Sequence, residues 1–118
     1  MTSMQVQDIK TVEKQFKTFA EFYPFYLSQH SKPLTKLFHF IGTCGGLTLW
    51  IRFLHSLTSK YPKYKYILYG LIFGYFMAWL SHFFIERNKP ATFTYPVWSF
   101  VGDWKMFLEV ILGKHRII

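Results

Sequence analysis

The hydrophobic positions in the first part of the chain repeat at the spacing of a helix. Over residues 8–27 they fall three and four positions apart, with lysines between them, at Ile9, Val12, Phe16, Phe19, Tyr23 and Tyr26. This pattern predicts an amphipathic helix, which either lies in a membrane interface or packs against another helix. Pro24 is expected to kink or end the helix, because its ring removes a hydrogen-bond donor and crowds the preceding turn.

Two longer apolar stretches follow, and each begins near a proline. The first is predicted to form a helix over residues 33–57, with Ser31 or Lys32 near its N-terminal cap, and the second a helix over residues 62–88. A helix rises about 1.5 Å per residue, so each apolar stretch is long enough to cross a bilayer. Only a short polar turn separates the two, and we therefore predict a transmembrane hairpin.

The C-terminal segment is predicted to form a helix over residues 96–113. Asp103, Lys105 and Glu109 lie among its apolar residues, and such charges are costly inside a bilayer. An amphipathic helix, packed on the hairpin or set in the interface, is therefore favoured over a third membrane helix. The predicted fold class is all-α: an integral membrane helical hairpin with an N-terminal amphipathic helix and a C-terminal helix that is either amphipathic or a third membrane helix, in a single domain over residues 1–118.

The composition agrees with a membrane protein and excludes several other classes. Hydrophobic residues make up 51% and aromatic residues 22% of the chain, which exceeds what the core of a small soluble domain needs. The net charge of +8 comes from residues that flank the apolar stretches and do not gather into a nucleic-acid-binding stripe. Cys44 is the lone cysteine, which excludes a disulfide framework and a cysteine-based zinc site, and we expect no secretory signal.

Counting along the two long helices brings three of the five histidines to one end of the hairpin. His39 lies six residues inside the start of the first helix and His82 six residues before the end of the second, so both sit about 9 Å inside the same membrane face. His30 falls in the connector before the first helix, on the same side. His55 lies sixteen residues beyond His39 and belongs to the opposite end.

Two carboxylates are expected near these histidines. Glu86 is one helical turn beyond His82, where it either pairs with Arg87 or Lys89 or holds His82 in one tautomer. Asp103 enters at a similar depth if the last helix begins near its proline. For Asp103 a salt bridge to a lysine or arginine is the favoured interpretation.

Three histidines with one or two carboxylates can hold a divalent metal, because neutral imidazole and carboxylate suit iron, zinc and manganese. Iron and zinc are the first choices. The absence of nearby thiols disfavours a structural zinc cage, whereas histidines with open coordination positions are the arrangement in which ferrous iron binds dioxygen. In the alternative interpretation, the histidines are hydrogen-bonding anchors at the membrane interface.

Four sequence motifs identify a family resemblance. They are FYPFY at residues 22–26, HSKP at 30–33, LFHFIG at 37–42 and HFFIERNKPA at 82–91. Together they resemble the metal-dependent 2-hydroxy fatty acid dioxygenases of phytosphingosine catabolism, and the resemblance runs from about residue 22 to residue 112. The fungal members are longer, with additional apolar segments between the last two motifs, where this chain has a short turn.

The resemblance implies ferrous iron, dioxygen and a 2-hydroxy fatty acid that is shortened by one carbon in α-oxidation. The iron ligands of the family carry over to His30, His39 and His82, the three histidines that the counting had already grouped. Glu86 is added to these three as a fourth catalytic residue. In fungi the family acts at the endoplasmic reticulum membrane.

We therefore expect an Fe(II)-dependent 2-hydroxy fatty acid dioxygenase in the bacterial cytoplasmic membrane, or in the endoplasmic reticulum membrane of a eukaryote. Its partners would be the fatty acid, dioxygen and membrane lipid, with the histidine end on the cytoplasmic side. The alternatives are a zinc- or iron-dependent lipid hydrolase or hydroxylase, and a non-enzymatic membrane protein. Gly42, Gly45 and Gly46 let another helix approach closely, which favours a homo-oligomer.

Overall fold

The computed structural model describes residues 16–117, and in this part of the chain every regular element is helical. Its elements are α2 (Phe19–Ser28), α3 (Pro33–Ser56), α4 (Lys65–Ser81), the π-helical turn η1 (His82–Glu86), the short 3₁₀ helix η2 (Ala91–Phe93) and α5 (Pro96–Ile111). The all-α prediction is confirmed for these residues. The three later helices differ from the predicted ones by only a few residues at their ends, whereas α2 begins at Phe19, because residues 16–18 are not helical. Residues 8–15 of the predicted N-terminal helix lie outside the described part.

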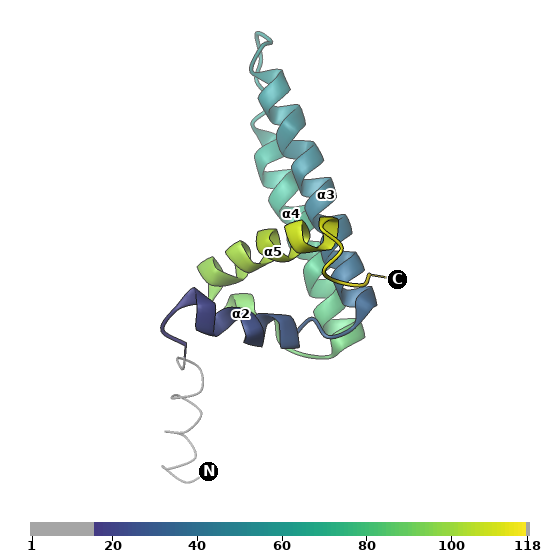
Figure 1. Cartoon of the computed structure of the whole chain (residues 1–118). Coiled ribbons are helices and arrows are strands. Elements are labelled where there is room, and N and C mark those ends of the chain that lie inside the picture. Colours follow the sequence, from purple (N-terminus) through teal and green to yellow (C-terminus); the bar gives the residue numbers. More distant parts are fainter. Residues whose placement is uncertain (1–15, 118) are drawn as a thin grey trace.

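The helices form a long antiparallel pair with two shorter helices at one end. α3 and α4 lie side by side, and α2 and α5 extend sideways from the end of this pair where α3 begins (Figure 1). η1 follows directly on α4 and η2 leads into α5, so both short elements lie at that same end. The chain's connections therefore gather the predicted site residues at the end that carries α2 and α5.

Glycines set the close packing of α3 against α4. A Cβ atom on Gly42 would lie 3.0 Å from the Cβ of Met77, and one on Gly46 would lie 2.9 Å from the carbonyl oxygen of Gly70. The predicted glycine surface of the first long helix is thus used within the chain, by α4. Its glycines no longer argue for a homo-oligomer.

The side chains of α3 and α4 are distributed in the opposite way to those of a water-soluble helix pair. Their buried positions hold small or polar residues such as Thr35 and Ser81, while Leu68, Ile72 and Phe76 are more than half exposed. Water-soluble proteins bury side chains of this size, whereas lipid solvates them. Both helical stretches, Pro33–Ser56 and Lys65–Glu86, are long and apolar enough to cross a membrane. That they cross it as a hairpin stays a prediction.

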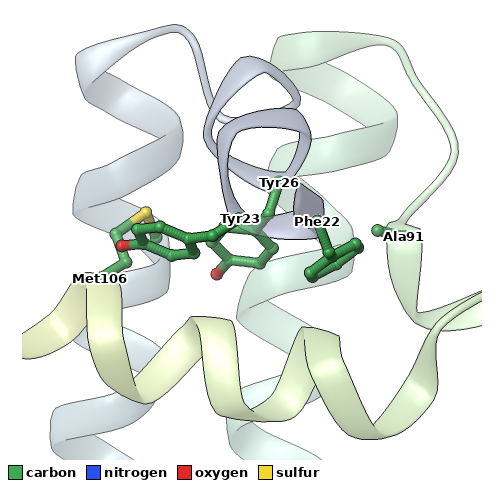
Figure 2. Packing of buried hydrophobic residues seen from close by; sticks show 5 residues of the cluster. All are labelled: Phe22, Tyr23, Tyr26, Ala91 and Met106. Atoms are coloured by element: carbon green, nitrogen blue, oxygen red, sulfur yellow. The ribbon is translucent and has the colours of Figure 1, made fainter. Parts of the chain in front are cut away.

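The compact hydrophobic core lies outside the long pair, between α2 and α5. Figure 2 shows its members, which are Phe22, Tyr23 and Tyr26 of α2, Ala91 of η2 and Met106 of α5. α2 therefore packs against another helix, which was one of the two predicted possibilities. α5 packs on α2 and α3, and among the described helices only the two long stretches meet the criteria for a membrane span.

α2 continues past its proline and contacts α5 through Tyr26. Pro24 lies inside α2 and does not end it, and the rings of Tyr23 and Tyr26 are buried in the core. Gly102 of α5 lies against the Tyr26 ring, where a Cβ atom would come within 3.1 Å of two ring carbons. Because Gly102 has no side chain, there is room for the ring of Tyr26, which lies four residues before His30.

Candidate metal centre

The structure brings His30, His39 and His82 together. His30 follows α2, His39 lies in the second turn of α3, and His82 is the first residue of η1. One ring nitrogen from each lies within 4.8 Å of the other two, and each side chain is at most 5% exposed. His55 is exposed in the last turn of α3 and takes no part in this group.

Each of the three rings faces a hydrogen-bond acceptor with its Nδ1 atom. The Nδ1 of His30 lies 2.6 Å from the carbonyl oxygen of Tyr26, and the Nδ1 of His82 lies 2.7 Å from the Oδ1 of Asn88. The Nδ1 of His39 lies 3.5 Å from the Oδ1 of Asp103. Because the oxygens of Tyr26 and Asn88 only accept, the Nδ1 atoms of His30 and His82 carry the donated hydrogens, and in the neutral rings their Nε2 atoms are lone pairs.

The Nε2 atoms of His30 and His82 face each other, and in the tautomers that their Nδ1 bonds favour neither carries a hydrogen. These two atoms are only 3.1 Å apart, and the Nε2 of His39 is buried without a hydrogen-bond partner. Unprotonated nitrogens in this arrangement repel one another and remain desolvated unless a cation lies between them. The donor set suits a divalent metal that accepts neutral imidazole, with each ring oriented from its far side as metal-ligating histidines usually are.

The environment of His30 keeps its imidazole neutral. Burial lowers the pKa of His30 well below its ordinary value, and the neighbouring His39 and His82 lower it further. Neutral imidazole is the form that binds a metal ion, since a protonated ring has no free lone pair. The site therefore has its ligand in the binding form without prior loss of a proton.

Asp103 connects the core to the metal centre. The hydroxyl of Tyr26 donates to its Oδ1 atom, the same oxygen that faces His39. Burial raises the pKa of Tyr26, and the adjacent carboxylate raises it further, so the hydroxyl stays a donor. The favoured interpretation of Asp103, a salt bridge to lysine or arginine, was wrong: its partners in the described part of the chain are a histidine and a tyrosine.

Glu86 lies beside the site but serves another element. Its carboxylate accepts hydrogen bonds from the backbone N–H of Lys32 at 2.7 Å, the hydroxyl of Thr35 at 2.8 Å and the hydroxyl of Ser31 at 2.9 Å. It thereby caps the start of α3, which has no cap from its own Lys32 side chain. The described residues show no hydrogen bond from Glu86 to a histidine, and its catalytic role stays a prediction.

Asn88, and not Glu86, is the hydrogen-bond partner of His82. After the π-helical turn, Arg87 adopts a left-handed conformation with φ of 57°, and the backbone N–H of Asn88 donates to the carbonyl of His82 at 2.9 Å. This reversal returns the Asn88 side chain to His82, while its Nδ2 donates to two oxygens of Gln29. Sequence reasoning did not find Asn88, because no regular helical spacing brings residue 88 back to residue 82.

Two further buried donors lie near the histidines. The indole Nε1 of Trp79 and the hydroxyl of Ser99 have no hydrogen-bond partner in the described part of the chain. Both residues line a small pocket that also contains all three histidines and Asp103. The pocket thus offers a polar ligand two donors that the protein itself does not satisfy.

Comparison with known families gives one match. The family described as 2-hydroxy-palmitic acid dioxygenase Mpo1-like matches residues 16–115, which include α2, α3, α4, α5 and the three histidines. No curated protein matches the chain, and no solved structure does.

Proposed function

The chain belongs to the Mpo1-like family, whose description indicates a 2-hydroxy fatty acid dioxygenase, and on this premise we propose an Fe(II)-dependent enzyme that shortens 2-hydroxy fatty acids by one carbon. The observation that carries this proposal is the convergence of three buried histidines, one of which, His39, has an Nε2 atom without a hydrogen-bond partner. The family resemblance predicted from the motifs is confirmed, whereas iron and the one-carbon shortening are proposed here.

The donor set fits ferrous iron. His30, His39 and His82 supply three neutral imidazoles and no thiolate, and three protein ligands leave positions open for substrate and dioxygen. Ferrous iron held there would supply the redox chemistry that lets dioxygen react with the bound acid. Zinc accepts the same ligands but cannot change its oxidation state, and the family's oxygen chemistry therefore favours iron.

The proposed reaction balances with dioxygen as the oxidant. The bond between C1 and C2 of the 2-hydroxy acid breaks, C1 leaves as carbon dioxide, and C2 becomes the carboxyl carbon of the shortened fatty acid. Dioxygen is reduced, with one water formed. No other oxidant or reductant is required.

The residues around the histidines have separable tasks in this reaction. Trp79 and Ser99 present the two unsatisfied donors, which suit the carboxylate or hydroxyl of the substrate head group. Asp103 orients the ring of His39, and burial of the whole group excludes water from the reacting atoms.

The exposed apolar faces of α3 and α4 support a location in the membrane. We place the histidine end at the cytoplasmic interface, with α2 and α5 beside it. A fatty acid in the bilayer then reaches the site with its head group at the interface and its chain among the helices.

The test is elemental analysis of detergent-purified protein, prepared under reducing and anaerobic conditions. The wild type is compared with His39→Ala and His82→Ala, and with His55→Ala as the matched control, because His55 is an exposed histidine of the same helix as His39. About one iron per chain in the wild type and control, lost in the other two, together with oxygen-dependent shortening of 2-hydroxy fatty acids, is the expected result.

Two results would contradict the proposal. Bound zinc with no gain of activity on adding iron would indicate the hydrolase alternative. No metal in the wild type, even after incubation with Fe(II), would leave the histidines as hydrogen-bonding groups of a non-enzymatic membrane protein.

A further inference from the structure

A groove begins at the metal centre and follows the α3–α4 pair away from it. His39 and Asp103 line one end, Gly42 and Gly74 lie along it, and Trp50 lines its far part. From His39 to Trp50 the α3 backbone advances about 16 Å, at 1.5 Å per residue. The groove is therefore long, and at one end it is lined by His39, one of the three clustered histidines.

Trp50 closes the far end of this groove. Its indole N–H donates to the carbonyl of Ile67 at 3.0 Å, which holds the ring across α4, over Gly70. The ring of Trp104 from α5 lies next to it, with 6.1 Å between ring centroids. Two aromatic rings from different helices thus meet where the groove ends.

The two ends of the groove differ in chemistry. At the near end, His39 is 95% buried and its Nε2 atom has no partner, so a polar or metal-bound group is expected there. Beyond Asp103 the lining is formed by glycines and by aliphatic and aromatic side chains, with Thr43 as its one hydroxyl residue of small size. A ligand with a polar head group and a long apolar tail would match the polar end and the apolar end of the groove.

Gly74 shows that the groove is more than a by-product of helix packing. Gly42 and Gly46 must be glycine because an added Cβ would meet α4 at 3.1 Å or less. An added Cβ on Gly74 meets only the carbonyl oxygen of Gly42, at an ordinary 3.7 Å. Packing of α3 on α4 therefore has room for a Cβ atom at Gly74, and the glycine leaves the middle of the groove open.

We propose that this groove binds the acyl chain of the 2-hydroxy fatty acid, and that Trp50 limits the chain length the enzyme accepts. The proposal takes its substrate class from the proposed function and deepens it. The head group lies at the histidines, and the methyl end of the chain lies against the two tryptophans.

The first experiment shortens and lengthens the groove. Gly74→Leu places a side chain in its middle, and we expect kcat/KM for long chains to fall about tenfold relative to short chains. Trp50→Ala removes the end wall, and the preference should shift to longer chains. Ile72→Phe adds bulk to the exposed face of α4 and serves as the matched control, with an unchanged chain-length profile. Iron content, measured on every variant, shows that the metal centre is intact.

The second experiment needs no catalysis. A 2-hydroxy fatty acid with a diazirine at its methyl end is photolysed with the protein in detergent, and labelled peptides are mapped by mass spectrometry. Labels at Trp50 and Trp104, moved or lost in Gly74→Leu, are expected. Labels confined to exposed residues such as Leu68 would overturn the groove proposal. So would variants that retain iron and lower kcat/KM equally for substrates of every chain length.

The two proposals fail in different ways. If the wild type binds no iron but the probe still labels the tryptophans, the groove stands and the dioxygenase proposal is wrong. If iron-dependent shortening is present but the labels avoid the groove, the dioxygenase stands and the groove proposal is wrong.

Discussion

Replacing Asn88 tests whether the hydrogen bonds behind the histidines prepare them to bind a metal. Its Oδ1 accepts from the Nδ1–H of His82 at 2.7 Å, and its Nδ2 donates to the backbone oxygen and Oε1 of Gln29. Asn88→Ala removes all of these bonds. Asn88→Asp keeps an acceptor facing His82 and removes the amide donor toward Gln29.

The size of the effect follows from the tautomer of His82. Without an acceptor at Nδ1, the buried ring gains nothing by keeping its hydrogen there, and the tautomer with hydrogen on Nε2 cannot bind a metal. Loss of such a partner usually lowers metal affinity about 10- to 100-fold, which is about 1.4 to 2.8 kcal/mol. Asn88→Asp should bind at least as tightly as the wild type, because a carboxylate makes the ring more basic.

The assay is competition between the protein and a chromophoric Fe(II) chelator under anaerobic conditions. Gln29→Ala is the matched control, since it removes one partner of Asn88 and leaves the bond to His82. We expect tight binding by the wild type, Gln29→Ala and Asn88→Asp, and weak binding by Asn88→Ala. Wild-type affinity in Asn88→Ala, or an equal loss in Asn88→Asp, would refute the reasoning.

Two further predictions concern the packing of α2 on α5. Burial raises the pKa of Glu109, but the hydrogen bond from Tyr23 and nearby cations outweigh it and hold the pKa at about 2, below the ordinary 4.5. The stability that Glu109 contributes is therefore complete above about pH 4.5 and is lost as the pH falls toward 2. The difference in Tm between the wild type and Glu109→Gln, measured in detergent, should shrink as the pH is lowered. A difference in Tm that does not change with pH would contradict this prediction. Gly102→Ala forces the Tyr26 ring to shift and should lower the free energy of unfolding by about 1 to 3 kcal/mol, which is measured as a lower Tm. The control Gly74→Ala should leave Tm nearly unchanged. Equal Tm values for the two variants would show that the contact between Gly102 and Tyr26 is not tight.

The helices and the histidine group were predictable because both depend on regular geometry. A helix fixes the depth of each residue by its position in the chain, so counting alone placed His39 beside His82. The same counting placed Asp103 at the right depth but gave it the wrong partner. Depth along a helix is set by sequence number, whereas the direction of a side chain depends on how the helices rotate against one another.

The residues behind the histidines were less predictable, because they depend on irregular backbone. Asn88 reaches His82 only through a π-helical turn and a left-handed Arg87, and neither has a clear signal in the sequence. Glu86 sits one turn beyond His82, and that spacing favoured a contact between them. The backbone N–H of Lys32 and the hydroxyls of Ser31 and Thr35 lie at the start of α3, and the Glu86 carboxylate accepts hydrogen bonds from these three groups.

The α3–α4 pair also has a practical consequence at the end away from the histidines. The core and the three clustered histidines lie near α2 and α5, whereas the turn over residues 57–64 is at the other end of the α3–α4 pair (Figure 1). Chain added at this turn changes no contact of the catalytic end. An affinity tag inserted there is expected to leave the histidine end unchanged, so its accessibility from each side of a vesicle would test whether the α3–α4 pair crosses a membrane and in which direction.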